Sequence, residues 1–230
     1  AARAGWLAAG GLLWGAGVWS MHFIGMLAFS LPCVTTYDPA ITLLSMLPGV
    51  VASTLAIHLI SRPAPGWGRL IPGGVLLGSG IGALHYTGMA AYRLDGFVRY
   101  DLALFVLSIV VAALLAVLAL WINFRAYRPD ARWNGKCTLV SALALGGAAS
   151  GMHYVAMAAT YFVRDERIVN PAASLAPEFL AAVVLSLTGA LIVLTLVFLY
   201  MAQPLFDGMR RKMSLALVLA AGWTVAAWYI

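Results

Sequence analysis

Histidine and methionine recur together, at a fixed spacing, three times in this chain of 230 residues. The shared pattern is Met or Leu, His, an aromatic residue, any residue, Gly or Ala, Met, any residue, Ala, and its copies cover residues 21–28, 84–91 and 152–159. In an α-helix, residues i and i+4 lie on one face, so each copy would present an imidazole and a thioether together. Both groups are metal ligands.

The distances between the copies predict how they are arranged. Successive histidines are 63 and 68 residues apart, the length of one helical hairpin, which indicates a three-fold duplication of a two-helix unit. Each histidine lies at a similar distance before the end of its apolar run. Three packed helices would therefore bring three imidazoles and three thioethers into one layer.

The candidate ligands are the histidine and the i+4 methionine of each copy, together with the methionines that precede two of the histidines. They are His22, Met26, His85, Met89, His153, Met157, Met21 and Met152. Thioethers select Cu(I), whereas imidazole also accepts zinc, iron or nickel. A zinc site more often includes a thiolate or carboxylate, and no carboxylate lies at this depth. We therefore expect copper, as Cu(I), with haem as the alternative because His and Met both serve as its axial ligands.

Other residues with chemical potential lack such a pattern. His58 has no counterpart in the repeat, and we interpret it as a structural, hydrogen-bonded residue. Cys33 follows the first apolar run and is interpreted as incidental, the alternative being an accessory ligand. The aromatic residues of the motif, Phe23, Tyr86 and Tyr154, are as typical of packing as of chemistry.

The composition places these motifs in a membrane. Hydrophobic residues make up 63% of the chain and charged residues 10%, against about 25% charged in ordinary globular domains. Runs long enough to span a bilayer cover residues 5–31, 40–60, 70–92, 101–124, 137–162 and 178–202, and a shorter run covers 213–230. The predicted fold is all-α, a polytopic membrane helix bundle of six to seven transmembrane helices built from three repeated hairpins.

Glycine predicts which helices pack together. The three motif-bearing runs contain most of the glycines, with GxxxG spacings at Gly11/Gly15, Gly74/Gly78/Gly82 and Gly147/Gly151. Such spacings favour close helix packing in lipid. The other runs are rich in Leu, Val and Ala. We expect three central motif helices inside three peripheral ones.

The loops predict the orientation. Ten of the 14 Lys and Arg residues lie in the N-terminus and in residues 61–69, 125–136 and 203–212. By the positive-inside rule these segments are cytoplasmic, so the motifs lie near the periplasmic side of the inner membrane. This topology explains the net charge of +6 without a nucleic-acid partner. Residues 203–212 are then a cytoplasmic basic loop, and 213–230 an additional candidate membrane helix.

No catalytic motif is visible, so an enzyme is not predicted. Intramembrane histidines also occur in transporters and proton relays, and this remains the alternative function. Such a protein would need a polar path toward the cytoplasm. The central helices offer only Ser79, Ser141 and Ser150 below the motif layer.

The three copies, most clearly Met152-His153-Tyr154 and the segment 19–29, resemble the MHYT domain of bacterial membrane sensors, over residues 1–202. The resemblance implies a membrane sensor domain for signal transduction that binds copper and a small diatomic ligand: oxygen, CO or NO. It also implies, as partners, the lipid bilayer and either a cytoplasmic output domain or a second copy of the chain. An output enzyme would lie elsewhere in the full-length protein.

The chain departs from the family pattern at three motif positions. Leu84 replaces Met, Phe23 replaces Tyr, and Ala156 replaces Gly. None of these changes removes a histidine or an i+4 methionine, so the ligand set is retained. The family pattern also includes a helix before the first motif, which we expect to precede Ala1 in a longer protein.

Overall fold

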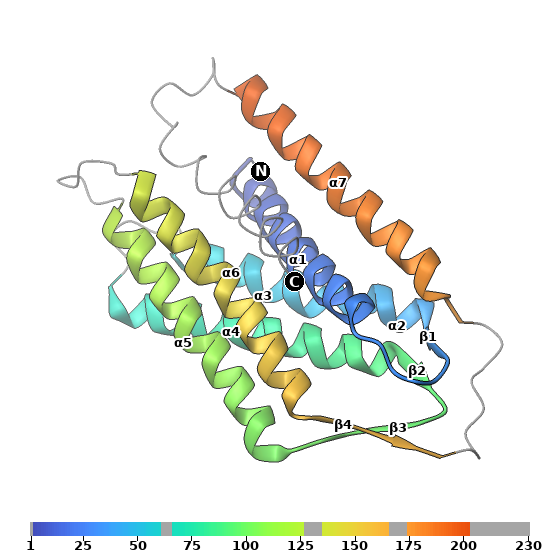
Figure 1. Cartoon of the computed structure of the whole chain (residues 1–230). Coiled ribbons are helices and arrows are strands. Elements are labelled where there is room, and N and C mark those ends of the chain that lie inside the picture. Colours follow the sequence, from blue (N-terminus) through green and yellow to red (C-terminus); the bar gives the residue numbers. More distant parts are fainter. Residues whose placement is uncertain (1, 61–65, 127–134, 166–173, 203–230) are drawn as a thin grey trace.

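The computed structural model describes residues 2–60, 66–126, 135–165 and 174–202. Its helices are α1 (Ala2–Ala28), α2 (Pro39–Leu44), α3 (Met46–Ile60), α4 (Trp67–Ala91), α5 (Leu102–Ala126), α6 (Gly135–Ala158) and α7 (Pro177–Ala202) (Figure 1). The predicted all-α bundle is confirmed. The predicted run 213–230 and the basic loop 203–212 lie outside the described residues.

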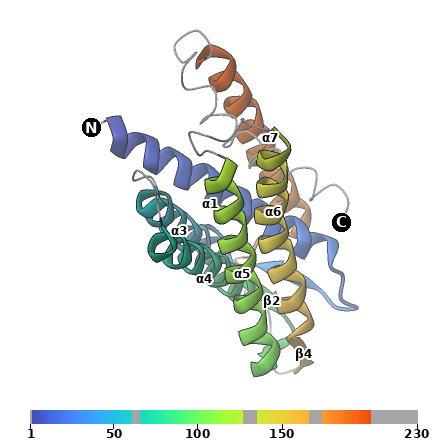
Figure 2. The same ribbon diagram turned by 90° about the vertical axis from the view of Figure 1, so that its left-hand side faces the viewer.

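The helices alternate between two roles, as the glycine pattern predicts. The motif helices α1, α4 and α6 contact one another, while α3 packs against both α1 and α4, and α5 packs against both α4 and α6. Figure 2 shows α5 and α6 lying side by side, with α3 and α4 next to each other. The third hairpin differs, because α7 packs against α1 and has at most marginal contact with α6 among the described residues.

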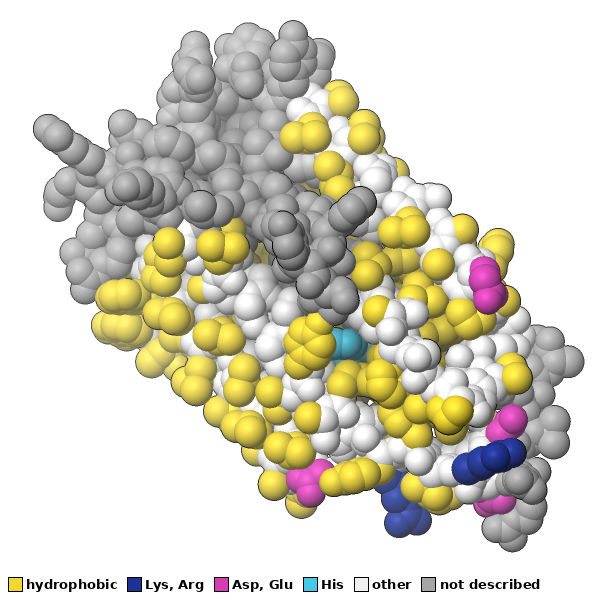
Figure 3. All heavy atoms as spheres, viewed as in Figure 1, with side chains coloured by type: hydrophobic (Ala, Val, Ile, Leu, Met, Phe, Trp, Pro, Cys, Tyr) yellow, Lys and Arg dark blue, Asp and Glu magenta, His cyan; other side chains and the backbone are white. Residues whose placement is uncertain are grey.

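Four spans are long and apolar enough to cross a membrane: Leu7–Ala28, Pro39–Ile60, Leu102–Ile122 and Pro177–Val197. The helices α4 and α6 are of similar length, but their glycines lower the mean hydropathy. The exposed surface shown in Figure 3 is largely hydrophobic, and its charged side chains lie toward the end that bears the strands. This distribution suits a bundle surrounded by lipid.

Short strands close one end of the bundle, which the sequence analysis did not predict. The strand β1 (Thr35–Tyr37) pairs antiparallel with β2 (Tyr92–Leu94), and β3 (Gly96–Tyr100) pairs antiparallel with β4 (Thr160–Arg164). Tyr37 also forms a bridge with Leu175. The segments that follow α1, α4 and α6 are therefore joined by backbone hydrogen bonds. We call this region the strand end.

Aspartate residues mark where two peripheral helices begin. Asp38 caps α2 by accepting a hydrogen bond from the backbone N–H of Ile41, and Asp101 accepts one from the N–H of Leu104 at the start of α5. The N–H of Asp38 donates to the carbonyl of Ala91, the last residue of α4, and the N–H of Asp101 donates to the carbonyl of Ala159, directly after α6. These equivalent contacts fix the starts of α2 and α5 to the ends of α4 and α6.

Candidate metal centre

The three motif histidines meet at the predicted common depth. His22 lies six residues before the end of α1, His85 six before the end of α4, and His153 five before the end of α6. Their side chains are 1%, 1% and 4% exposed. The predicted layer of imidazoles is confirmed, inside the core and close to the strand end.

The three rings turn the same nitrogen toward a shared centre. The Nδ1 atom of His85 lies 3.0 Å from Nδ1 of His22 and 3.2 Å from Nδ1 of His153. The ring planes meet at 76° to 83°, with centroids 4.8 to 5.4 Å apart. In the described part of the chain, these three residues form the one group of His, Cys, Asp or Glu with metal-binding spacing.

Hydrogen bonding within the group leaves imidazole nitrogens poorly satisfied. Nδ1 of His85 is shared between two neighbouring Nδ1 atoms, although a neutral imidazole offers there only one proton or one lone pair. The buried Nε2 atoms of His22 and His85 have no hydrogen-bond partner among the described residues. A metal cation would accept all three lone pairs at once. Ligands held about 2.0 Å from a metal at tetrahedral angles are about 3.3 Å apart, close to the separations found here.

The other nitrogen of two of the rings lies against a glycine of a neighbouring helix. A Cβ atom added to Gly25 would come 2.7 Å from Nε2 of His153, and one added to Gly88 would overlap Nε2 of His22. Both glycines occupy the third position after the motif histidine. The small residue at this position is visible in the repeated motif, but the motif alone assigns it no role. The structure indicates that it makes room for the next imidazole.

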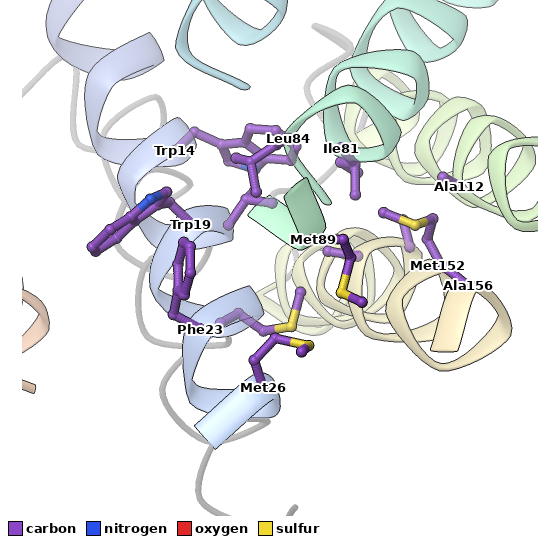
Figure 4. Packing of buried hydrophobic residues seen from close by; sticks show 14 of the residues in the cluster. Trp14, Trp19, Phe23, Met26, Ile81, Leu84, Met89, Ala112, Met152 and Ala156 are labelled. Atoms are coloured by element: carbon purple, nitrogen blue, oxygen red, sulfur yellow. The ribbon is translucent and has the colours of Figure 1, made fainter. Parts of the chain in front are cut away.

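The methionines belong to the same buried core. Met21, Met26, Met89 and Met152 are at most 5% exposed, and Met157 is partly buried against them. Figure 4 shows the labelled Met26, Met89 and Met152 projecting from three different helices into this core. The thioethers therefore come from the same layer of the bundle as the histidines. Their role as ligands remains a prediction.

Two residues lie outside the histidine group. Cys33 is a free, partly buried cysteine beyond the end of α1 and is not among the clustered ligands. His58 is exposed on α3. Neither residue contributes to the centre in this arrangement.

Aromatic side chains cover the histidines on the side of the strand end. Phe23 contacts the His22 ring at a centroid distance of 4.8 Å and packs against Tyr37 at 5.9 Å. Tyr37 packs against Tyr92 at 5.3 Å, and Tyr92 against Phe162 at 5.9 Å. Burial, together with the neighbouring Tyr92, raises the pKa of the Tyr37 hydroxyl. These rings, which we call the aromatic cap, separate the centre from water.

One ion pair ties the strand end together. Arg93, in β2, contacts the carboxylate of Asp38, beside β1, at 3.0 Å. The hydrogen bond from the Ile41 N–H, with the Arg93 guanidinium, lowers the pKa of the Asp38 carboxyl. This carboxylate therefore holds two of the paired segments in place.

The geometry does not favour haem. A haem held by two imidazoles lies between them, with one axial nitrogen on each face of the porphyrin. Here the Nδ1 atoms are in direct contact, and the rings leave no space for a macrocycle between them. A single small ion fits the arrangement better.

Comparison with known protein families identifies the repeat. The family model of the bacterial signalling protein N-terminal repeat, MHYT, matches residues 15–73 and 78–144. These two matches cover more than half of the chain. The chain belongs to the MHYT family. It is a membrane domain of the kind found in bacterial signalling proteins.

Similar proteins include enzymes of nucleotide signalling. The chain is 41% identical over 192 residues to the bifunctional diguanylate cyclase/cyclic di-GMP phosphodiesterase MucR of Pseudomonas aeruginosa, a match covering 84% of the chain and 28% of MucR. It is 39% identical over 155 residues to the cyclic di-GMP phosphodiesterase NbdA of the same organism, covering 67% of the chain and 20% of NbdA.

A third relative comes from another organism. The signaling protein YkoW of Bacillus subtilis is 33% identical over 161 residues, which cover 70% of the chain and 20% of YkoW. The chain thus spans about a quarter of the length of these relatives or less. No solved structure matches it.

Proposed function

We propose that this MHYT domain is a sensory domain that binds one Cu(I) ion through Nδ1 of His22, His85 and His153, and a diatomic gas at that ion. The observation that carries the proposal is the convergence of three buried Nδ1 atoms, two pairs of which are 3.0 and 3.2 Å apart. The Nδ1 atom of His85 has to serve both contacts, and the buried Nε2 atoms of His22 and His85 have no hydrogen-bond partner among the described residues.

The donor set supports copper over zinc. Structural zinc sites are almost always four-coordinate, usually with thiolate or carboxylate ligands. Among the described residues, the group supplies three imidazoles and no carboxylate. Cu(I) is a soft ion and accepts both imidazole and thioether. The buried methionines therefore suit Cu(I) better than they suit zinc.

Bound Cu(I) would supply a soft site to which oxygen, CO or NO can bind reversibly. The protein's own residues prepare that site. Gly25 and Gly88 let the imidazoles of neighbouring helices approach closely, which fixes the direction of each Nδ1 lone pair. The aromatic cap excludes water. The surrounding apolar core favours small, uncharged ligands over ions.

The location of the domain follows from charge and from its relatives. The distribution of Lys and Arg supports an inner-membrane location with the strand end facing the periplasm. MucR and NbdA are named for cyclic di-GMP synthesis or hydrolysis. We propose that this domain controls a comparable cytoplasmic output, so that a gas bound near the periplasmic side changes an activity inside the cell.

The transporter alternative gains no support from the polar residues below the centre. Ser141 donates its hydroxyl hydrogen to the carbonyl of Ala119 in the neighbouring helix. Ser79 is exposed on the outside of α4. The third serine, Ser150 of α6, has a buried hydroxyl with no hydrogen-bond partner among the described residues. The three serines therefore form no continuous hydrogen-bonded path from the histidines in the described part of the bundle. Flux measured in proteoliposomes would distinguish the two functions, and we expect none.

Metal analysis after anaerobic loading with Cu(I) tests the proposal. We expect one copper per chain in the wild type and none above background when His22, His85 and His153 are all replaced by alanine. The matched control is His58→Ala, which removes an exposed histidine and should leave copper binding unchanged. A carbonyl stretch in the infrared spectrum after addition of CO would support gas binding. A Soret band in the purified protein would favour haem instead.

A further inference from the structure

The first two units of the repeat correspond to each other beyond the motif, at a constant offset of 63 residues. His22 and His85 define this offset. The aspartates Asp38 and Asp101 are the same distance apart, and each accepts a hydrogen bond from the backbone N–H three residues later, at 3.0 and 2.9 Å. A residue of one unit can therefore be compared directly with its counterpart in the other.

This offset makes Ser45 and Ser108 counterparts. Ser45 lies between α2 and α3, Ser108 lies in α5, and both are 0% exposed. Each donates its hydroxyl hydrogen to the carbonyl three residues earlier, that of Thr42 or Phe105, with an O···O distance of 2.7 Å. A serine hydroxyl has only one hydrogen, so its oxygen is left as an acceptor. Each unit therefore holds a buried hydrogen-bond acceptor at the same place.

The two units direct different aromatic donors at this acceptor. In the second unit, the hydroxyl of the motif tyrosine Tyr86 lies 2.9 Å from Oγ of Ser108. Tyr86 is the donor, because the hydrogen of this serine already serves a carbonyl. In the first unit, the motif position is Phe23, which has no hydroxyl. The indole N–H of Trp19 instead donates to Oγ of Ser45 at 3.2 Å.

Trp19 compensates for the missing hydroxyl of Phe23. Its ring packs against that of Phe23 at a centroid distance of 4.9 Å, and Figure 4 shows the two side chains together on α1. The counterpart of Trp19 in the second unit is Gly82, which offers no donor side chain. The acceptor is thus retained in both units although the donor changes.

The imidazoles beside these aromatic rings lack the hydrogen bond that usually orients a metal ligand. A metal-binding histidine almost always donates its second ring N–H to a carboxylate, a carbonyl or water. The buried Nε2 atoms of His22 and His85 have no hydrogen-bond partner among the described residues. Each ring instead meets an aromatic ring edge to face, Phe23 at 4.8 Å from His22 and Tyr86 at 4.9 Å from His85.

We propose that Ser45 and Ser108 are positioning residues, which orient the first two motif histidines through these aromatic side chains. The hydrogen bond fixes the aromatic side chain to the neighbouring helix, so its ring is a fixed wall beside the imidazole. His85 depends on this wall most, because its Nδ1 contacts the Nδ1 atoms of both other histidines. The effect on copper rests on the proposed function, whereas the effect on the ring positions does not.

The ring ¹⁵N chemical shifts of the histidines test this proposal in metal-free protein. The chain has four histidines, so each signal can be assigned by replacing one histidine at a time. Ser108→Ala and Tyr86→Phe should each shift the ring signals of His85, because both remove the hydrogen bond that holds the Tyr86 ring. The double variant should shift them no further. Additive shifts, or none, would overturn the proposal.

Ser53→Ala is the matched control. Ser53 is also 0% exposed, and its hydroxyl donates to the carbonyl of Gly11 across the α1–α3 contact, at 2.9 Å. The change therefore removes a comparable buried hydroxyl whose partner is backbone and not an aromatic ring. We expect lower stability and unchanged histidine signals. If Ser53→Ala shifts the His85 signals as much as Ser108→Ala does, the effect is one of general packing and the positioning role is refuted.

The first unit provides a second, independent comparison. Trp19→Phe should shift the ring signals of His22, because it removes the N–H donor and keeps an aromatic ring beside Phe23. Ser45→Ala should have a smaller effect, because Trp19 also donates to the carbonyl of Thr42 at 2.8 Å. Unchanged His22 signals in both variants would exclude this role in the first unit.

Competitive Cu(I) titration then connects the ring positions to the proposed function. Ser108→Ala should weaken binding about 10-fold, the lower end of the range for residues that orient a metal ligand, while Ser53→Ala should leave it unchanged. Unchanged affinity in Ser108→Ala, despite shifted His85 signals, would overturn the effect on the metal. A wild-type protein that binds no copper would refute the proposed function, and the metal-free comparison would still decide the positioning role.

Discussion

Replacing Gly25 by alanine should damage the centre without touching a proposed ligand. The new Cβ would lie 2.7 Å from Nε2 of His153, whereas ordinary contact begins at 3.4 Å, so the imidazole must retreat by 0.7 Å. It has little freedom to do so, because its Nδ1 already lies 3.2 Å from Nδ1 of His85. The strain should therefore appear as a displaced His153 ring.

The magnitude follows from two opposing effects. Overpacking a filled core costs about 1–3 kcal/mol, while Gly→Ala within a helix contributes about 0.8–1.0 kcal/mol of stability. We expect a net loss of up to about 2 kcal/mol. Metal–ligand distances tolerate about 0.2 Å, less than the required displacement. Copper affinity should therefore fall about 10- to 100-fold, as for other changes that disturb the orientation of a ligand.

Thermal unfolding in detergent and competitive Cu(I) titration would measure these effects. Gly17→Ala is the matched control, because it lies on the same helix and its Cβ would meet no atom of the described residues within 4 Å. It should be neutral or stabilising. In a His153→Ala background, Gly25→Ala should lose its stability cost, because the clash is gone. Equal behaviour of the two glycine variants, or additive effects in the double variant, would refute this packing.

Three further predictions concern other parts of the domain. Met89→Leu should weaken Cu(I) binding less than His85→Ala, as measured by competitive titration, because it keeps the core filled and removes the weaker donor; an equal loss would contradict this. The pKa of Asp38 is below its ordinary value of 3.8, so its stabilising effect is complete above that pH and is lost as the pH falls through the lowered value. Asp38→Asn keeps the α2 cap but removes the titrating carboxylate, so the melting temperature should fall less steeply as the pH is lowered. An unchanged dependence of melting temperature on pH at the acid end would exclude this stabilising effect of the Asp38 carboxylate. A cysteine at Asp95 should react with an impermeant reagent from the periplasm, while one at Asp130 should not, and the reverse pattern would invert the topology.

The parts of the fold with a repeating pattern could be predicted from the sequence. The motif spacing gave the common depth of His22, His85 and His153, because helix geometry converts residue number directly into height. The glycine content distinguished central from peripheral helices for the same reason, since small residues permit close packing. Both the depth of the histidines and the division into central and peripheral helices were predicted from patterns that recur over many residues.

The strand end and the position of α7 were not predictable in this way. The strands have three to five residues, and their pairing joins loops that are far apart in the sequence. Strand β4 begins at Thr160, so α6 ends at Ala158 and not at residue 162 as expected. The position of α7 depends on its packing against α1, which its apolar sequence does not specify.

The role of Gly25 and Gly88 was missed for a related reason. Their position in the motif was visible, but a glycine on a membrane helix usually indicates helix packing in general. Only the three-dimensional arrangement shows that an imidazole from the next helix occupies the space. The small third residue after each histidine was the signal that could have found it.

X-ray absorption spectroscopy of the anaerobic Cu(I)-loaded domain tests the central claim most directly. We expect imidazole nitrogen scattering at about 2.0 Å, together with sulfur scattering from the motif methionines. Both should be absent from the variant in which His22, His85 and His153 are alanine, because that variant should not retain copper. A copper spectrum of equal intensity and shape from the triple variant would contradict the assignment of the metal to this centre.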